Sequence, residues 1–197
     1  MKSTLTALFA VALAGSAAYA QSTAPQGAAL PKTTPPEISR AAAITVDIKG
    51  AGGKSVGKAT LTDAPDGVII RIEMAAGSLT PGWHGIHLHE KGDCSDAAFT
   101  NSGGHVGHGM NNKQHGLLNS AGPEFGDLPN IYAPNKAPIG AELFTTLVTM
   151  GDTPSAGRAP LQDTDGSAIV IHASPDDGKT QPIGGAGARV ACAVIKK

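Results

Sequence analysis

The stretch GWHGIHLHE, residues 82–90, decides how the rest of the chain is interpreted. It holds three of the seven histidines, and strand-forming residues and glycine flank them, which predicts a β-strand that runs into a loop. Successive side chains of a strand point to opposite faces, so His87 and His89 share one face and His84 lies on the other. A His-x-His pair on one strand face brings two imidazole nitrogens close enough to bind one metal ion.

Period-two alternation of apolar and polar residues recurs in the rest of the chain. It is clearest over residues 44–49 and 68–74. Glycine- and proline-containing turns separate these runs from further candidates, and no apolar repeat of helical spacing is found between them. The pattern predicts an all-β fold, an antiparallel sandwich or barrel of eight strands. The other six predicted strands are 56–62, 83–90, 130–133, 142–150, 167–173 and 189–195.

Two segments are far longer than hairpin loops, residues 90–128 and 174–188, and long loops in a compact domain are typically functional. Every histidine lies either between residues 84 and 115 or at position 172, near a strand end. Histidine is a common metal ligand, so this grouping predicts a metal site. Imidazole suits copper, zinc, iron or nickel, and the residue types alone do not choose among them. The loop residues concerned are His105, His108, His115, Glu124 and Asp127.

The amino-terminal 40 residues have the composition of two processing and linking segments. Residues 1–20 combine Lys2, an apolar run and the small-residue end Ala-Tyr-Ala, which predicts a secretory signal peptide. The run is shorter than the roughly 20 residues of a transmembrane helix, so we predict no membrane span and an exported protein. Residues 21–40 are rich in Pro, Ala, Thr and Ser and predict a flexible linker, which leaves residues 41–197 as one domain.

The charge and the cysteines narrow the function further. A formal net charge of −1 argues against a nucleic-acid partner. Cys94 and Cys192 are the only cysteines, and in an exported protein an isolated pair predicts a disulfide. It would close a loop of about a hundred residues and contribute about 4–5 kcal/mol in the chain-entropy model. Two buried free thiols are the alternative, and they fit an exported protein less well.

Four motifs together resemble a known family. They are HGIHLH at 84–89, GGH at 103–105, GDLP at 126–129 and GGAGARVACAV at 184–194. Their order and content are similar to those of the copper/zinc superoxide dismutases, most closely the bacterial secreted branch. The resemblance covers residues from about 42 to 197 and leaves the linker out.

The resemblance implies an eight-stranded Greek-key β-barrel that carries the two long loops, with copper and zinc as cofactors and the superoxide anion as substrate. It also implies the residues of the copper site. His87, His89 and His172 match copper ligands, and His105 matches the histidine that bridges copper and zinc. Arg189 matches the arginine beside the copper.

Other positions match the zinc site and its support. His115 and Asp127 match zinc ligands, and Asp176 matches the carboxylate that connects the two metal sites. Asp176 also lies in a Pro-Asp-Asp-Gly turn sequence, and the two roles are compatible. Cys94 and Cys192 match the family disulfide between the long loop and the last strand.

One position departs from the family pattern. Glu124 stands where the family places its third zinc histidine, three residues before the aspartate. A carboxylate can bind zinc, so Glu124 is our prediction for the fourth zinc ligand. Two alternatives remain open: Glu124 points to solvent and zinc is weak or absent, or His108 takes its place.

The predicted activity is dismutation of superoxide, in which His105 supplies a proton and Arg189 attracts the anion. An exported copper-binding or copper-delivery module on the same fold is the first alternative, although storage has no use for Arg189. A cupin-type metalloenzyme is a second, but its carboxylate follows the His-x-His pair by a few residues, whereas Glu90 follows His89 directly. We predict that the protein is located in the periplasm, with secretion beyond it as the alternative. Family members occur as monomers and as dimers, so the resemblance is compatible with either a monomer or a homodimer.

Overall fold

The computed structural model describes residues 43–197. The predicted signal peptide, the predicted linker and the first two residues of the predicted domain lie outside the described residues. The described part consists of strands and loops with three short 3₁₀ helices: η1 (Ala51–Gly53), η2 (Thr100–Ser102) and η3 (Met110–Asn112). None of its helices is both long enough and apolar enough to cross a membrane.

Eleven strand segments make up the described domain. The first group is β1 (Ala43–Gly50), β2 (Ser55–Ala64), β3 (Gly67–Met74), β4 (Gly82–His84) and β5 (Ile86–His89). The second is β6 (Ile131–Ala133), β7 (Ile139–Thr145), β8 (Val148–Thr149), β9 (Ala159–Pro160), β10 (Ser167–His172) and β11 (Arg189–Ile195). The prediction of an all-β fold is therefore confirmed.

The period-two pattern forms strands because it gives one face to the core and the other to water. In β3, Ile70 and Ile72 are buried, while Arg71 and Glu73, which alternate with them, are exposed. Strands β5 and β10 differ from this pattern, since every residue in them is buried. Both of these strands carry histidines, so the side chains predicted to bind metal emerge from the most buried part of the sheet.

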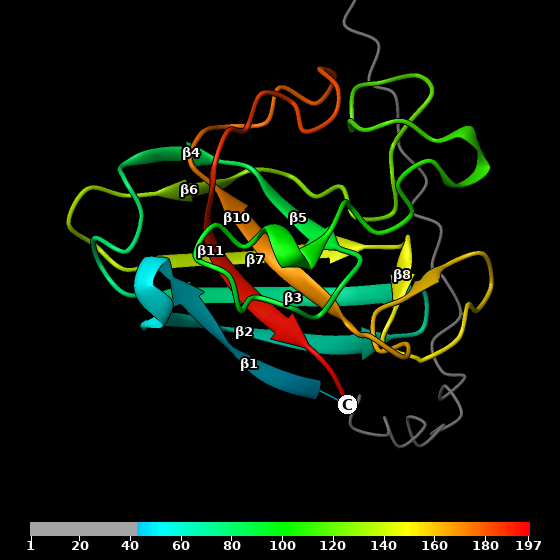
Figure 1. Ribbon diagram of the computed structural model, residues 1–197, viewed down its shortest axis with the longest axis horizontal. Coiled ribbons are helices and arrows are strands. Elements are labelled where there is room, and N and C mark those ends of the chain that lie inside the picture. The colour runs from blue at the N-terminus through cyan, green and yellow to red at the C-terminus, as the bar shows by residue number, and fades with distance from the viewer. Residues whose placement is uncertain (1–42) are drawn as a thin grey trace, which may run out of the picture. The chain divides into compact units, whose positions relative to one another are not determined.

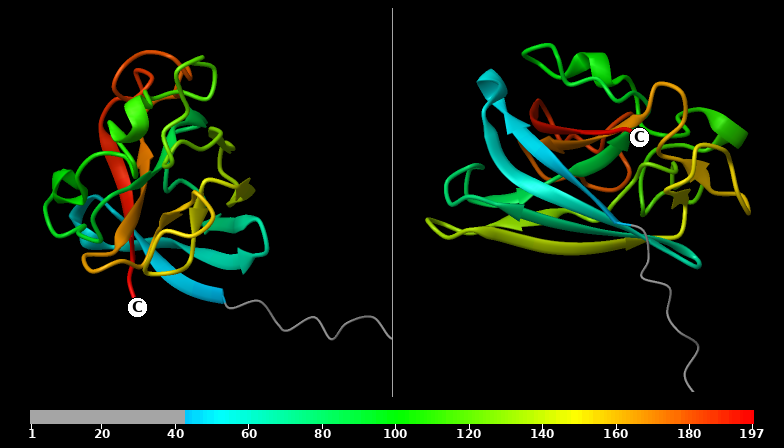
Figure 2. Two further views of the ribbon diagram at one scale, coloured as in Figure 1. Left: turned by 90° about the vertical axis from the view of Figure 1, so that its right-hand side faces the viewer. Right: turned by 90° about the horizontal axis from the view of Figure 1, so that it is seen from below.

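Seven strands form one sheet in the order β5-β10-β11-β1-β2-β3-β7, and every pair in it is antiparallel. The sheet curls, so that β5, β10 and β11 cross over the layer of β1, β2, β3 and β7 (Figure 1, Figure 2). One hydrophobic cluster fills the space between the two layers, with Ile48, Leu61, Ile70, Ile86 and Ile171 among its buried residues. The curled sheet and its strand order are those of the Greek-key barrel that the resemblance implies.

The predicted strand 83–90 is interrupted, which corrects its interpretation as one strand. Gly85 separates β4, which pairs with β6, from β5, which pairs with β10. A side chain at Gly85 would come within 2.9 Å of the Ala186 side chain, so only glycine fits there. His84 therefore belongs to a different pair of strands from His87 and His89. The break in the strand, and not the alternation of side chains along one strand, therefore separates His84 from His87 and His89.

A second predicted strand, 142–150, is also divided. Its first part belongs to β7 in the large sheet, and its second part is β8, which forms a short parallel pair with β9. Counted as β4 with β5 and β7 with β8, the structure has the eight predicted strands plus the two-residue β9.

Parts of the two long loops, residues 106–122 of the first and 174–188 of the second, lie together at the top of Figure 1, whereas η2 of the first loop lies in front of the sheet. The backbone N–H of Leu118 donates to the carbonyl of Gly178 over 3.0 Å, and the Gln181 side chain donates to the carbonyl of His115 over 2.8 Å. A side chain at Gly116 would collide with the Gly178 backbone, so the loops touch through glycines. This contact brings residues more than 60 positions apart to one edge of the sheet.

Candidate metal centre

Two neighbouring strands and one loop bring four histidines together. Strands β5 and β10 pair so that His87 lies opposite Val170, and His172 follows at the end of β10. His105, in the first long loop, forms an isolated β-bridge with His89. One nitrogen from each ring lies within 4.8 Å of the others. We call His87, His89, His105 and His172 the four-histidine cluster.

Each ring of the four-histidine cluster has one buried nitrogen without a hydrogen-bond partner. These atoms are Nδ1 of His87 and Nε2 of His89, His105 and His172. All four residues are buried, and a buried polar atom without a partner is costly. Four such atoms facing one point fit a bound metal ion, because the ion would satisfy all of them at once. Imidazole nitrogens suit copper, so the donor set agrees with the copper site that the resemblance implies.

In three rings of the four-histidine cluster, the other nitrogen donates a hydrogen bond to a fixed acceptor. His89 Nδ1 donates to the Gly103 carbonyl over 2.9 Å, and His172 Nδ1 donates to the Gly187 carbonyl over 3.0 Å. His87 Nε2 donates to an oxygen of Asp176 over 2.8 Å. These bonds place the proton on the outer nitrogen and leave the inner nitrogen with its lone pair, as metal binding requires.

Burial keeps these rings neutral. It lowers the pKa of His87, it lowers the pKa of His89 well below its usual range, and it lowers the pKa of His172 to about 4. At neutral pH the inner nitrogens are therefore free of protons, and a metal ion meets no competing proton at these three rings.

A second group shares His105 with the first. His105, His115, Glu124 and Asp127 each offer a donor atom within 4.8 Å of the others, and all are buried. We call them the mixed cluster. His105 Nδ1 lies 2.9 Å from Glu124 Oε2 and 3.2 Å from Asp127 Oδ1, and His115 Nδ1 lies 2.8 Å from the same Asp127 oxygen. Two imidazoles and two carboxylates are donors that zinc accepts.

Hydrogen bonds between imidazoles and carboxylates connect the mixed cluster. Burial alone would lower the pKa of His115, but its hydrogen bonds with Asp127 and Asp176 outweigh burial and raise the pKa to about 10. The pKa of His105 is raised in the same way, against burial, by Asp127 and Glu124. Burial opposes ionisation of Asp127, yet the hydrogen bonds from His105 and His115 lower its pKa. The mixed cluster is thus a network of ion pairs.

The structure brings Glu124 into the cluster and leaves His108 outside it. Glu124 is fully buried, and its Oε1 accepts a 2.6 Å hydrogen bond from His108 Nδ1. The His108 side chain is 57% exposed. Of the two residues considered for the fourth zinc ligand, Glu124 has the geometry for it, and the alternative in which Glu124 points to solvent is wrong.

Asp176 lies between the two clusters. Its carboxylate accepts from His87 Nε2 over 2.8 Å and from His115 Nε2 over 3.2 Å. Burial opposes its ionisation, but the hydrogen bonds from these two rings lower its pKa. The side chain of Asn130 fixes the backbone of Asp176 with two hydrogen bonds. Its Nδ2 donates to the Asp176 carbonyl, and its Oδ1 accepts from the Asp176 N–H.

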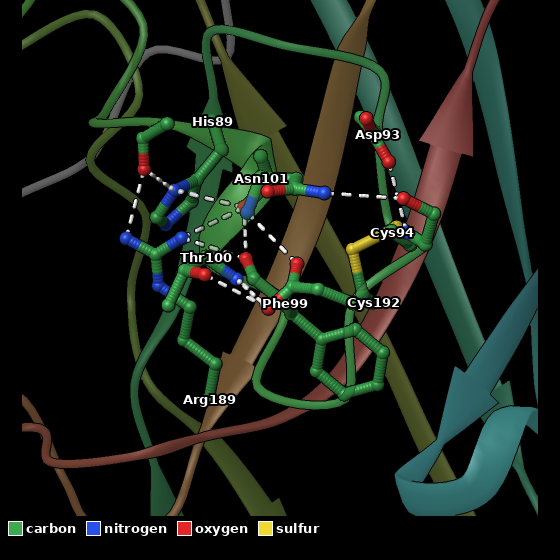
Figure 3. The surroundings of a disulfide bond; sticks show 12 residues. His89, Asp93, Cys94, Phe99, Thr100, Asn101, Arg189 and Cys192 are labelled. Carbon is green, nitrogen blue, oxygen red and sulfur yellow. Dashed lines mark hydrogen bonds between the residues drawn. A yellow bond between two sulfur atoms is a disulfide. The ribbon is translucent and has the colours of Figure 1, made fainter.

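Arg189, the first residue of β11, is anchored on the long loop that also carries the disulfide (Figure 3). Its Nη1 donates to the Phe99 carbonyl over 2.7 Å and to Ser102 Oγ over 2.9 Å, and Nη2 donates to the Gly103 carbonyl over 2.8 Å. The Gly103 carbonyl also accepts from His89, so the guanidinium of Arg189 and a ring of the four-histidine cluster share one acceptor. Burial lowers the pKa of Arg189.

The predicted disulfide is present. Cys94 and Cys192 are bonded, with Cα atoms 5.9 Å apart, and they are 98 positions apart in sequence (Figure 3). It ties the long loop to β11, and Phe99 packs beside it with residues of β10. The loop that carries the three acceptors of Arg189 is therefore fixed to the strand that carries Arg189 itself.

Some of these contacts could not be predicted from the sequence. The carbonyls of Gly103 and Gly187, which orient His89 and His172, belong to motifs that resemble the family, but backbone acceptors leave no residue-type signal. Asn130 follows the GDLP motif directly, and only its contact with Asp176, 46 residues away, reveals its role.

The comparisons with known proteins agree with this geometry. The family model described as copper/zinc superoxide dismutase (SODC) matches residues 55–195. A superoxide dismutase [Cu-Zn] of Caulobacter vibrioides is 51% identical over 152 residues, which cover 77% of this chain and 84% of that protein. Superoxide dismutase [Cu-Zn] 2 of Aquifex aeolicus is 38% identical over 145 residues, 73% of this chain and 81% of that protein.

Solved structures show the same relationship. A double mutant of a SOD-like protein from Bacillus subtilis aligns with a TM-score of 0.71 and 33% identity, covering 78% of this chain and 97% of that one. The Cu/Zn superoxide dismutase from Brucella abortus aligns with a TM-score of 0.60 and 26% identity, covering 78% of this chain and 99% of that one. The family match spans most of the chain and the relatives match along most of their own length, so this protein belongs to the copper/zinc superoxide dismutase family.

Proposed function

We propose that the protein dismutates superoxide: two superoxide anions and two protons give oxygen and hydrogen peroxide. The observation that carries the proposal is the set of four buried, unpartnered nitrogens of the four-histidine cluster. His87, His89, His105 and His172 would hold copper there. Bound copper supplies a one-electron couple that one superoxide reduces and the next reoxidises.

His105 has a second task in this proposal. Its Nδ1 faces the carboxylates of the mixed cluster, and its Nε2 faces the other three rings without a partner. Nε2 is therefore the atom at which the chain can hold a proton beside the substrate. His105 would supply that proton when the second superoxide becomes peroxide.

Arg189 attracts the anion in this proposal. Its hydrogen-bond acceptors are two carbonyls and one hydroxyl, none of which carries a compensating negative charge. Within residues 43–197 it forms no salt bridge with a carboxylate. A positive charge held rigidly beside the four-histidine cluster raises the local concentration of a small anion and its rate of arrival.

The mixed cluster would hold zinc through His105, His115, Asp127 and Glu124. The support for Glu124 is its full burial and its 2.9 Å contact with the ring shared by the two clusters. Asp176 would orient His87 on the copper side and His115 on the zinc side, as carboxylates commonly do for metal-bound imidazoles. Zinc there would fix the ring of His105 and the loop that carries it.

For the chain as a whole, we propose a signal peptide at residues 1–20, a linker at 21–40 and the enzyme domain at 41–197. The disulfide supports an oxidising compartment, and the periplasm is our proposal, with secretion beyond it as the alternative. All proposed ligands come from one chain, so the mechanism serves a monomer or a homodimer equally. A net charge of −1 gives no reason to propose a nucleic-acid partner.

The test is superoxide decay per bound copper, followed by pulse radiolysis, for protein loaded with copper alone and with copper plus zinc. We expect fast decay that persists in excess EDTA, which silences copper that is not bound to the protein, and faster decay still with zinc. Tight one-to-one copper binding without decay above that of the metal-free protein under the same conditions would overturn the enzyme and leave the copper-delivery module. Fast decay at a rate that does not depend on zinc would support the dismutase activity and overturn the role of the mixed cluster.

A further inference from the structure

His108 lies beside the mixed cluster without belonging to it, and it holds the carboxylate that departs from the family pattern. Each oxygen of Glu124 faces a different histidine: Oε1 lies 2.6 Å from His108 Nδ1, and Oε2 lies 2.9 Å from His105 Nδ1. Glu124 is fully buried, whereas 57% of the His108 side chain is exposed. His108 thus contacts Glu124 from the solvent side, and His105 contacts it from the metal side.

The turn that carries both histidines is fixed against Glu124. The backbone N–H of His108 donates to the His105 carbonyl over 3.0 Å, which closes the turn. Gly107 lies between them with a φ of 78°, and a side chain there would come within 2.5 Å of the Phe125 ring. The N–H of Gly126 donates to the carbonyl of Val106 over 3.0 Å. The position of His108 relative to Glu124 is therefore set by the backbone on both sides.

This arrangement addresses a chemical problem that glutamate brings to a histidine position. A histidine offers a metal one donor atom, whereas a free carboxylate offers two and can rotate between them. A buried carboxylate oxygen without a partner is also costly. A hydrogen bond from His108 to Oε1 removes both difficulties, because it stops the rotation and satisfies the oxygen that faces away from the metal.

We propose that His108 is a positioning residue: it occupies Oε1 of Glu124 and leaves Oε2 as the single oxygen offered to zinc. The pair Glu124–His108 then takes the place of the one histidine that the family has at this ligand position. The inference rests on the proposed function, in particular on zinc in the mixed cluster. His108 does not bind the metal in this account.

The test compares two variants of His108 in the copper- and zinc-loaded protein. H108A removes the hydrogen bond, and H108N keeps an N–H donor near the position of Nδ1. We expect zinc transfer to a colorimetric chelator to be about 10–100-fold faster in H108A and close to wild type in H108N, because partners of metal ligands contribute this much to affinity. Copper content should be unchanged in both. Cobalt(II) in the zinc position should show an altered visible spectrum in H108A and an unaltered one in H108N.

The same two variants in an E124H background complete a double-mutant cycle. With histidine at position 124 there is no carboxylate to position, so H108A should leave zinc release unchanged there. Release from H108A at the wild-type rate would overturn the inference, and so would an equal effect of H108A in both backgrounds. If H108A and H108N lose zinc alike, His108 is itself a ligand and the inference is wrong. A wild-type protein that binds no zinc would overturn the proposed zinc site as well, and this separates the two failures.

Discussion

The four-histidine cluster and the mixed cluster share the ring of His105, yet their donor atoms are satisfied in opposite ways. In the first, four inner nitrogens have no partner, and the outer nitrogens of three of its rings are held by Gly103, Gly187 and Asp176. In the second, the nitrogens of His105 and His115 that face the carboxylates donate to them. In the four-histidine cluster the inner nitrogens face one another without hydrogen bonds, whereas in the mixed cluster hydrogen bonds join the imidazoles to the carboxylates.

The difference follows from the residue types. Four imidazoles cannot satisfy one another when their outer nitrogens already hold the protons, and burial lowers the pKa of His172 to about 4. Two carboxylates beside two imidazoles instead hold protons tightly, and the pKa of His115 rises to about 10. Three rings of the first cluster offer a cation nitrogens that carry no proton, whereas in the second the cation must replace protons.

The largest effect should come from breaking the four-histidine cluster alone. We expect H89A to reduce superoxide decay, measured in excess EDTA, to the level of the metal-free protein and to weaken copper binding by more than about 100-fold, because it removes a ligand and not merely a ligand's partner. Zinc content should stay near that of the wild type, because His89 contributes no donor atom to the mixed cluster. Copper and zinc content by mass spectrometry and the decay rate check this. Loss of both metals together would contradict the separation of the clusters.

A smaller effect should come from Arg189, which serves the four-histidine cluster without binding metal. We expect R189A to slow superoxide decay by about tenfold and to flatten its dependence on ionic strength, because a fixed charge that attracts the substrate is lost. Copper and zinc content should not change. R189K is the matched control, since it keeps the charge and loses the planar contacts with Phe99 and Gly103. Unchanged kinetics in R189A would contradict the assignment of Arg189 as the group that attracts superoxide.

The smallest effect expected is a difference in pH dependence between the metals. Below pH 10, zinc must displace the proton that His115 Nδ1 shares with Asp127, so zinc affinity should fall as the pH falls from 8 to 6. Copper meets no such proton on His87, His89 or His172, so its affinity should change less. Isothermal titration of each metal in buffers of different ionisation enthalpy measures the protons released. Equal release by copper and zinc would contradict the contrast between the clusters.

Much of the fold followed from local pattern. The predicted strands match every strand of the large sheet to within a few residues, and the alternating strands were predictable because one of their faces lies in the core. The break at Gly85 was not predictable from alternation, since it depends on the close approach of Ala186, about a hundred residues later. The division of 142–150 into β7 and β8 likewise depends on β9, a partner that the pattern did not reveal.

The candidate site was predictable where residue type carries the chemistry. The histidines, the cysteine pair, Arg189 and Asp176 all stood out in the sequence. The resemblance assigned their roles, and the structure brings the histidines assigned to metal binding, Arg189 and Asp176 to the site. What the sequence left open was Glu124, because burial and the contact with His108 are properties of the folded loop. The partners that orient the rings, such as Asn130 and the Gly103 carbonyl, act through long-range contacts that a pattern of residues does not encode.

The central claim is that this chain has two distinct metal sites, the second completed by Glu124. The most direct test is the metal content of wild type, E124A and E124H after loading with one equivalent each of copper and zinc and removal of free metal. We predict one copper and one zinc in the wild type and in E124H, and one copper with most of the zinc lost in E124A. Zinc retained by E124A as fully as by the wild type would contradict the account.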